Sequence, residues 1–460
     1  MNKEIKWIGW DLSTSSLTAI GRTEKGEEVF VSVPMEGKAV LLGQPAHDLD
    51  LVPLMMDRVL EKIEAQGFTF AKEGVTCFSV RQHDLALLGH NNNEPVVDAL
   101  SWEFELDPVA GVEELQNFRE KGYESVVGPT DKRFIAVKLK WLINMIPKIA
   151  PLIKQVMTTG DAIGYWLTGN AFIGTSDGMS NAILDKNKKL ALEVLQGLGF
   201  DLSWFPQPIQ SGMSVGYIQK PREGDAWNPV KNRLAGWDYR AGSGDNDAGA
   251  RGSGLDDFVT IVMSFGSSGT VTRIARTLAA LAGNALTFEY FHHCLLLNML
   301  EHCANWYDKF VRNNPKASEL SYDQLNDLAL DVPYKVIKPN EYPNDWNDWT
   351  LAQQIATIQK SIAFEMVERA AGMLKEVKDP QAPKIERVIV TGGLKQSPLI
   401  LRVIKDLLGS FDIYVSALEE PFASQSAARG ALITAMMPRW DFGAYGRLAK
   451  EMCPIKPLEF

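Results

Sequence analysis

The hydrophobic positions of this chain follow two periods that alternate along its length. Short apolar runs typical of buried strands occur at residues 5–10, 75–80, 258–265 and 388–390. Apolar residues at helical spacing occur at 50–66, 135–146, 150–156, 163–167, 188–198, 350–374, 398–408 and 424–437. Strands that alternate with helices predict an α/β fold.

Two of the predicted strands open similar patterns. The run at 5–10 leads through a turn of small residues to a second strand at 17–20, and the run at 258–265 leads through another such turn to a strand at 270–275. The repeated layout suggests an internal duplication. Residues 202–240 are rich in Pro, Gly, Trp and Gln, which predicts loops and edge strands near a domain boundary. We therefore expect two domains, 1–240 and 241–460.

Charge and composition exclude several classes of protein. The formal net charge is −10, which disfavours a nucleic-acid partner because phosphate backbones require clustered Lys and Arg. No apolar run approaches the roughly 18 to 20 residues of a membrane helix, and the N-terminal residues lack a signal-peptide pattern. Four scattered cysteines do not form a disulfide framework, so we expect a cytoplasmic protein without a membrane partner.

A glycine-rich loop at residues 241–248 carries the main candidate for catalysis, Asp245. Phosphoryl transfer to an alcohol needs a group that accepts the hydroxyl proton, and a carboxylate in a glycine loop can approach a substrate without a bulky neighbour. The alternative is a solvated turn, because Gly, Asp and Asn are common turn residues.

Two further turns of small residues have the composition of phosphate-binding loops. Their backbone amides and hydroxyl groups can donate to phosphate oxygens. The residues assigned to this role are Ser13, Thr14, Ser15, Gly266, Ser267 and Ser268. Asp11, at the end of the first strand, can hold a magnesium ion. Ordinary hairpin turns are the alternative for both loops.

The C-terminal third contains one weak ligand-binding signal and one motif that we reject. Gly392 and Gly393 follow a strand, and Ser397 precedes a helix, which suits close approach of a flat ligand such as adenine. The His and Cys residues between 292 and 303 fit no familiar zinc spacing, so no metal is expected there.

Taken together in this order, the motifs resemble the FGGY carbohydrate kinase family, most closely its xylulokinase-like members. The resemblance covers roughly residues 5 to 440. The segments that carry it are 8–16, 81–84, 138–142, 161–169, 175–177, 244–246, 266–270 and 391–393.

The resemblance implies two actin-like ATPase (ribonuclease H-like) domains with a ligand cleft between them. It implies a MgATP-dependent kinase that phosphorylates a hydroxyl of a small sugar or polyol, with a ketopentose such as xylulose as one candidate and a homodimer as one assembly. Asp245 would be the general base, and Asp11 and Asp245 would lie near the magnesium ion. The expected substrate-binding residues are Arg81, His83, Trp102, Glu103, Asp245 and Asn246.

Several positions depart from the family pattern. Thr18 stands where a Lys or Arg is usual, and Leu394 replaces a third glycine. Arg81 and Asp84 replace a Gln and a Gly, and Glu103 replaces an Asn near the substrate. These changes keep two alternatives open: a nucleotide-binding regulator or pseudokinase with the same fold, and an actin-like ATPase that hydrolyses ATP without a sugar.

Overall fold

The computed structural model describes residues 3–91, 94–106, 109–266, 268–276, 286–339, 341–376, 383–409, 413–419 and 423–457. The chain forms two compact units. The first comprises Met1–Gly252, Leu286–His292 and Ala427–Leu448, and the second comprises Ser253–Ala285, His293–Ser426 and Ala449–Phe460. The units therefore interleave in sequence, and the expected domain ranges 1–240 and 241–460 stay a prediction.

The elements of the first unit are numbered in chain order. Its strands are β1 (Lys3–Leu12), β2 (Ser16–Thr23), β3 (Glu28–Pro34), β4 (Lys38–Leu41), β5 (Gln44–His47), β6 (Phe68–Val80), β7 (Leu85–Gly89), β8 (Ala99–Leu100), β9 (Ile153–Thr158), β10 (Ile173–Gly174), β11 (Pro208–Ile209), β12 (Ser214–Tyr217), β13 (Asp238–Gly244) and β16 (Leu286–Tyr290). Its helices are α1 (Val52–Ala65), α2 (Val112–Glu120), α3 (Glu124–Val127), α4 (Ile135–Met145), α5 (Thr159–Thr168), α6 (Thr175–Met179), α7 (Leu192–Gly197), α8 (Asn228–Leu234), α9 (Asp245–Gly252) and most of α15 (Ser426–Met436) and α16 (Phe442–Met452).

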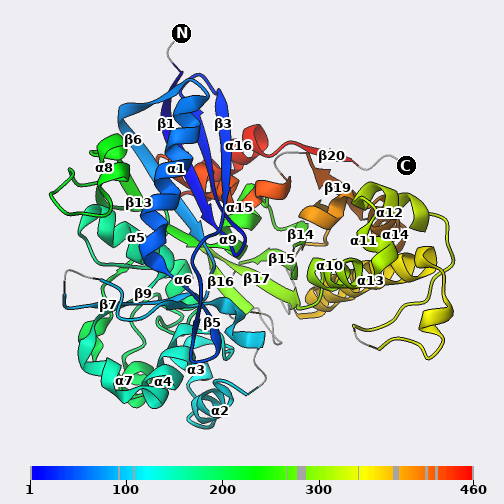
Figure 1. Cartoon of the computed structure of the whole chain (residues 1–460), viewed down its shortest axis with the longest axis horizontal. Coiled ribbons are helices and arrows are strands. Elements are labelled where there is room, and N and C mark those ends of the chain that lie inside the picture. Colours follow the sequence, from blue (N-terminus) through cyan, green and yellow to red (C-terminus); the bar gives the residue numbers. More distant parts are fainter. Residues whose placement is uncertain are drawn as a thin grey trace. The chain divides into compact units, whose positions relative to one another are not determined.

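The main sheet of the first unit has the strand order β12-β13-β6-β1-β2-β3. Strands β1, β6 and β13 are parallel, and the outer strands run antiparallel to their neighbours. Ile8, Trp10 and Leu12 are fully buried in a core shared with α1, α5 and α8. Gly9 alternates to the opposite face, where an added Cβ would lie 2.1 Å from the backbone nitrogen of Leu432 in α15. Helices therefore pack on both faces, and α1 contacts β2 and β3 (Figure 1).

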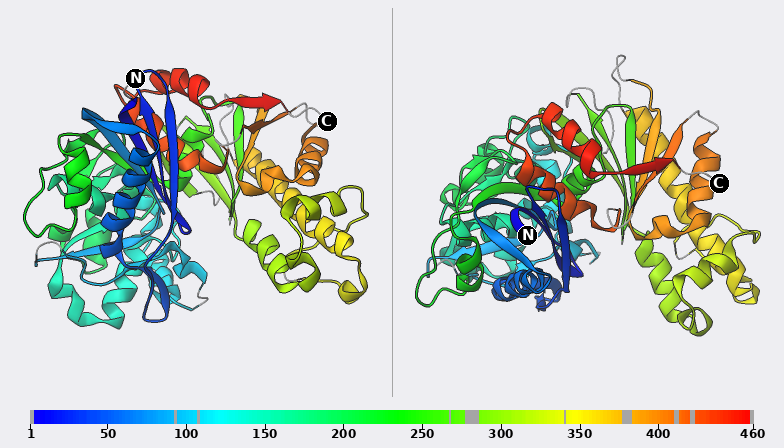
Figure 2. Two further views of the ribbon diagram at one scale, coloured as in Figure 1. Left: turned by 45° about the horizontal axis from the view of Figure 1, so that its top comes forward. Right: turned by 90° about the horizontal axis from the view of Figure 1, so that it is seen from above.

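The second unit repeats this sheet. Its strands are β14 (Thr260–Phe265), β15 (Gly269–Ala275), β17 (His293–Leu300), β18 (Arg387–Thr391), β19 (Tyr414–Leu418) and β20 (Ile455–Pro457). They lie in the order β20-β19-β18-β14-β15-β17, which has the same sequence of parallel and antiparallel pairs as the order β12-β13-β6-β1-β2-β3 of the first sheet. Its helices are α10 (Ala304–Asn313), α11 (Pro315–Ser318), α12 (Tyr322–Ala329), α13 (Leu351–Glu376) and α14 (Pro398–Gly409), of which α13 and α14 pack against the sheet (Figure 2). The strand–turn–strand layout that the sequence repeats is thus part of a larger pattern of six strands, which occurs once in each unit.

A smaller sheet in the first unit carries part of the candidate site. Its strand order is β4-β5-β8-β7-β9. The turn 81–84 leads from β6 in the main sheet to β7 in this one, and β8 leads directly into a 3₁₀ helix at Trp102–Leu106. The turn 81–84 and the segment after β8 therefore lie where the two sheets of this unit meet.

The predicted helices at 50–66, 350–374, 398–408 and 424–437 correspond to α1, α13, α14 and α15. The helix predicted at 150–156 is wrong. Residues 147–152 form a 3₁₀ turn that contains Pro151, and β9 follows and pairs with β7, so that tertiary pairing overrides a short helical pattern. The helix predicted at 188–198 is shorter, because Lys188 has a φ of +63° and belongs to the preceding turn. Within the described ranges, no helix has the length and apolar character needed to cross a membrane.

Candidate active site

Three parallel strands of the first unit end level with one another, and the candidate residues follow these ends. Leu12 of β1 pairs with Val80 of β6, and Val80 pairs with Gly244 of β13. Asp11, Arg81 and Asp245 are therefore brought to the same edge of the sheet from distant parts of the sequence. Carboxyl ends of parallel strands are the usual ligand-binding edge of α/β sheets.

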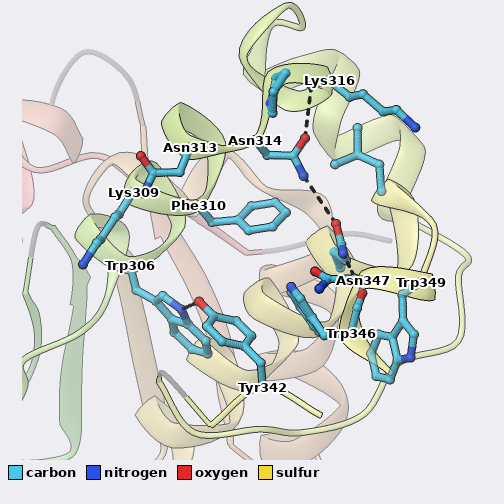
Figure 3. A pocket seen from close by; sticks show the side chains of 13 residues that line it. Trp306, Lys309, Phe310, Asn313, Asn314, Lys316, Tyr342, Trp346, Asn347 and Trp349 are labelled. Carbon is cyan, nitrogen blue, oxygen red and sulfur yellow. Dashed lines mark hydrogen bonds between the residues drawn. The ribbon is translucent and has the colours of Figure 1, made fainter. Parts of the chain in front are cut away.

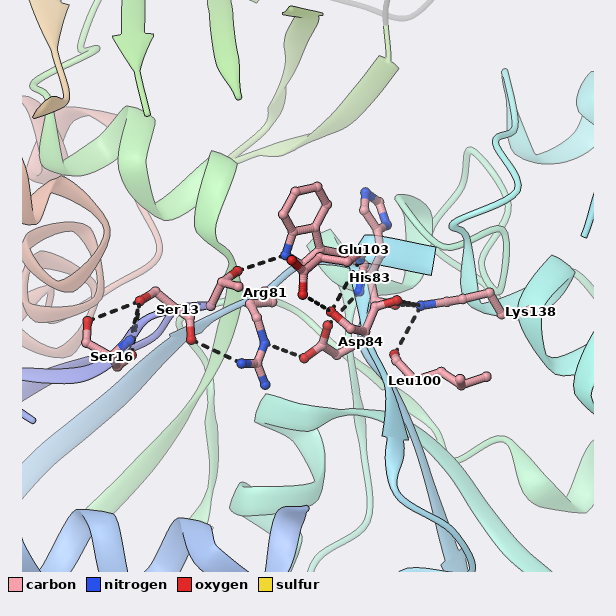
Figure 4. A network of polar contacts seen from close by, with 11 residues as sticks. Ser13, Ser16, Arg81, His83, Asp84, Leu100, Glu103 and Lys138 are labelled. Carbon is pink, nitrogen blue, oxygen red and sulfur yellow. Dashed lines mark hydrogen bonds and ion pairs between the residues drawn. The ribbon is translucent and has the colours of Figure 1, made fainter. Parts of the chain in front are cut away.

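Arg81 forms the centre of a polar network at this edge (Figure 4). Its side chain is 1% exposed, and Nε donates to Oδ2 of the equally buried Asp84. Nη1 donates to the carbonyl oxygen of Ser13 at 3.0 Å. Oδ1 of Asp84 accepts from the backbone N–H of Trp102 at 2.9 Å. This ion pair thus joins the loop 13–15 after β1, the turn 81–84 and the segment after β8.

Two more side chains strengthen the same connections. The indole Nε1 of Trp102 donates to Oγ1 of Thr14 at 2.9 Å. Lys138 of α4 donates to the carbonyl oxygens of His83, Leu100 and Ser101, the last two at 3.2 Å each. Burial lowers the pKa of Lys138 to about 7. Lys138 lies in the segment 138–142 that carries the family resemblance. Nothing in the spacing of this segment indicated that the ammonium group would bind three carbonyls.

His83 is held by packing and by a hydrogen bond. Its ring stacks on Phe134 with centroids 5.0 Å apart, and Nδ1 lies 3.1 Å from Oδ1 of Asn181. Burial holds the pKa of His83 well below its ordinary value, so the imidazole is neutral near pH 7. Glu103 is partly exposed, and its carboxylate accepts from the hydroxyl of Ser101 at 3.5 Å.

Asp245 and Asp11 are the two carboxylates with the chemistry expected of the site. Burial, and next the charge of Asp11, raise the pKa of Asp245 to about 7. Burial also raises the pKa of Asp11 to about 6, although its carboxylate accepts from the hydroxyl of Ser79 at 2.9 Å. Both side chains keep part of their accessible surface. A partly accessible carboxyl group with a pKa near 7 is suited to accept a proton from a substrate hydroxyl.

The glycine-rich loop expected at residues 241–248 is wrong, because β13 runs to Gly244 and α9 begins at Asp245. Side-chain hydrogen bonds anchor this junction between strand and helix. Asn246 donates to Oε1 of Gln82 at 2.7 Å. Asp247 accepts from Arg251 at 2.6 Å and from Ser176 at 3.0 Å, and Arg251 also donates to Ser243 at 2.5 Å. The Asp247–Arg251 spacing of four residues in α9 was the available signal for this buried ion pair.

The carboxylates fit the magnesium ion that the resemblance implies. Mg²⁺ keeps several waters and is usually bound by one or two carboxylates together with substrate phosphates. Asp11 and Asp245 would supply these two carboxylates, and the charge of Asp11 disfavours a second negative charge on Asp245 unless a cation offsets it. Across the described residues, no group of three or more His, Cys, Asp and Glu forms a complete protein-ligated metal site.

In the second unit, the predicted ATP-binding residues gather at the equivalent strand ends. Gly266 and Ser268 lie in the turn between β14 and β15, while Ser267 lies outside the described residues. Gly392 has a φ of +90°, and an added Cβ would lie 2.6 Å from the carbonyl carbon of Phe265, whereas Gly393 faces open space. The hydroxyl of Ser397 donates to Gln359 at 2.8 Å and accepts from the N–H of Ile400 at 3.3 Å.

A separate cavity of about 630 Å³ opens in the second unit (Figure 3). Its lining includes Trp306, Phe310, Tyr342, Trp346 and Trp349 and none of the predicted site residues. The indole of Trp306 donates to the hydroxyl of Tyr342 at 2.9 Å. This cavity is therefore distinct from the candidate active site.

No family model matches the chain. Among curated proteins, the xylulose kinase of Lactococcus lactis subsp. lactis is 24% identical over 446 residues, which cover 90% of this chain and 85% of the relative. The xylulose kinase of Staphylococcus xylosus is 27% identical over 300 residues, which cover 63% of this chain and 58% of the relative.

Solved structures match almost the whole chain. A ligand-bound xylulose kinase and a gluconate kinase, both from Lactobacillus acidophilus, each have a TM-score of 0.80 at 16% and 15% identity, and each match covers 98% of this chain and 93% of the other. Plasmodium falciparum glycerol kinase with ADP has a TM-score of 0.77 at 13% identity and covers 98% of this chain and 94% of the other. The predicted fold of two actin-like domains and the resemblance to FGGY carbohydrate kinases are confirmed.

Proposed function

We propose that this chain is an ATP-dependent carbohydrate kinase of the FGGY type, in which Asp245 accepts the proton of the attacking hydroxyl. The observation that carries the proposal is the pair of carboxylates at the level strand ends, Asp11 and Asp245, beside a loop of hydroxyl residues. The pKa of Asp245, about 7, lets the same group take a proton at neutral pH and return it to water afterwards.

Each part of the site has a role in this reaction. The loop of Ser13, Thr14 and Ser15 offers amides and hydroxyl groups to the γ-phosphate. Magnesium, held by Asp11 with Asp245, would neutralise charge on the phosphate oxygens. Trp102 and His83 would form walls for the sugar, since one is tied to Thr14 and the other is fixed against Phe134.

The acceptor is a small sugar or polyol. Relatives named for xylulose, gluconate and glycerol support this class without choosing within it. We further propose a cytoplasmic enzyme, because the chain has only four cysteines and they are scattered along the sequence. We also propose that the protein forms a homodimer and has no nucleic-acid partner. A measurement of molecular mass in solution tests the homodimer.

The experiment is ADP release by the purified protein with MgATP across ketopentoses, aldoses, sugar acids and polyols. Asp245→Asn is the test variant, and Asp323→Asn, at an exposed site in α12, is the matched control. Release that one compound stimulates, and that only Asp245→Asn abolishes, supports the kinase. ATP binding without stimulation by any compound supports the regulator, and ATP hydrolysis without a sugar supports an actin-like ATPase.

A further inference from the structure

The first phosphate loop carries no positive charge of its own. No Lys or Arg occurs between Asp11 and Gly21. Within the loop, the Ser13 hydroxyl bonds to Ser16, and Oγ1 of Thr18 bonds to the Ser32 hydroxyl at 2.9 Å. A phosphoryl group in transfer carries charge on three oxygens, and active sites place cations against that charge. Any protein cation that assists magnesium at this loop must therefore come from another segment of the chain.

Arg81 is placed to supply that charge. Nη1 binds the Ser13 carbonyl, so the guanidinium lies directly against the loop. Arg81 follows β6, which pairs on one side with β1, the strand of Asp11, and on the other with β13, the strand that leads to Asp245. The pairing with Asp84 fixes the plane of the guanidinium because Asp84 is itself held by the N–H of Trp102.

One nitrogen of this guanidinium has no protein acceptor. Nε donates to Asp84 and Nη1 to Ser13, but Nη2 is buried and lacks a hydrogen-bond partner within the part of the chain that the structure describes. A buried donor left unpaired costs about 1 to 3 kcal/mol, so an acceptor such as a ligand oxygen or a bound water stabilises it. The free Nη2–H group is a preformed donor for an anionic oxygen.

We propose that Nη2 of Arg81 donates to a non-bridging oxygen of the transferred γ-phosphoryl group, an inference that rests on the proposed kinase function. In the step itself, the acceptor hydroxyl oxygen forms a bond to the γ-phosphorus, and the bond to the β,γ-bridging oxygen breaks. ADP leaves with that electron pair, and the hydroxyl proton passes to Asp245. Arg81 makes no covalent bond and stabilises the charge of the phosphoryl group during transfer.

A carboxylate of an acidic acceptor is the other source of an anionic oxygen. It is less suited, because Asp11 and Asp245 already place two carboxylates beside Arg81, and a third would add repulsion. A phosphoryl group arrives with magnesium, which offsets that repulsion. The test must therefore detect the phosphoryl group in the absence of any acceptor.

The probe is MgADP with and without aluminium fluoride, which occupies the position of a phosphoryl group in transfer. The readout is the melting temperature, and the test protein is the double variant Arg81→Gln, Asp84→Asn, which removes the ion pair without leaving a buried charge unpaired. We expect wild type to gain more stability from MgADP with fluoride than from MgADP alone. The double variant should keep the MgADP gain, lose the extra gain, and lose about 10²- to 10³-fold in kcat with little change in the acceptor KM.

The conservative variant Arg81→Lys decides the question if the double variant does not fold. A reduced extra gain supports the inference, because a lysine keeps the charge but not the fork of donors, and an unchanged extra gain contradicts it. The inference is overturned if aluminium fluoride still raises the melting temperature of the double variant, or if only the KM for the acceptor rises. Neither result contradicts the proposed kinase function. The inference is also overturned if aluminium fluoride does not raise the melting temperature of wild type beyond the value with MgADP alone. The kinase function is rejected only if, in addition, no acceptor stimulates ADP release.

Discussion

The two units build the same strand pattern and place different residues at its ends. In the first unit, the ends of β1, β6 and β13 lead to Asp11, Arg81 and Asp245. In the second unit, Ser264 of β14 pairs with Thr391 of β18, and the residues that follow are Gly266 and Gly392. One edge therefore concentrates charge, which the proposed proton and phosphoryl transfer needs, whereas the other carries glycines, which would let a ligand approach the backbone. A shared topology determines where a site lies, and the residues at the strand ends determine what it does.

The largest effect is expected at the charged edge. Asp245→Asn keeps the shape of the side chain but cannot accept a proton, so kcat should fall about 10³-fold. Binding of ADP without magnesium, measured by calorimetry, should persist because the residues assigned to the nucleotide are unchanged. A variant that retains most of its kcat would remove the proposed difference between the two edges.

The glycine edge offers a matched pair of substitutions. Gly392→Ala forces a side chain into a positive φ and against the backbone of Phe265, and we expect it to lower the free energy of unfolding by about 2 to 3 kcal/mol. Gly393→Ala meets open space and should leave the melting temperature unchanged while raising the KM for ATP. Equal destabilisation by both variants would contradict the geometry described for this edge.

The pH dependence of activity should come from the charged edge. Asp245 works as a base only when deprotonated, and its pKa is about 7. We expect kcat/KM to rise about tenfold per unit of pH below 7 and to level off above it. The residual activity of Asp245→Asn should lack this limb, and a wild-type profile that is flat from pH 5 to 8 would exclude Asp245 as the base.

The smallest effect is on stability and has the opposite sign to the effect on activity. The pKa of Asp245 is raised in the folded state, from 3.8 to about 7, so folded protein holds more protons than unfolded protein in that interval. The stability contribution of this group is therefore fully present below pH 4 and is lost as the pH rises through about 7. At pH 8, Asp245→Asn should raise the free energy of unfolding by about 1 kcal/mol, less than the full shift implies because the carboxyl is partly solvated.

Chemical denaturation of wild type and Asp245→Asn at pH 5 and pH 8 measures this difference. The stabilisation should be larger at pH 8 than at pH 5, since wild-type Asp245 is charged only at the higher pH. A variant that is less stable than wild type at both values would show that the carboxylate stabilises the start of α9, where Asp247 pairs with Arg251.

The sequence by itself determined the class of fold, the repeated strand–turn–strand layout and the identity of the candidate residues. Long helices such as α1 and α13 were predictable because their apolar period extends over several turns. The short segment 150–156 was not, because pairing of β9 with β7 decided its conformation. Asp11 and Asp245 could be proposed from loop composition and resemblance alone, and the roles of the site residues stay predictions.

Only the tertiary structure decided how these residues meet. Arg81 reaches the Ser13 carbonyl across 68 positions of sequence because β1 and β6 pair in parallel and end together. Lys138 binds three carbonyls of two loops, and Nη2 of Arg81 stays without a protein acceptor in the described part of the chain. A local period reports which face of an element is buried, but hydrogen bonds and electric fields depend on distances that only the packed sheets define.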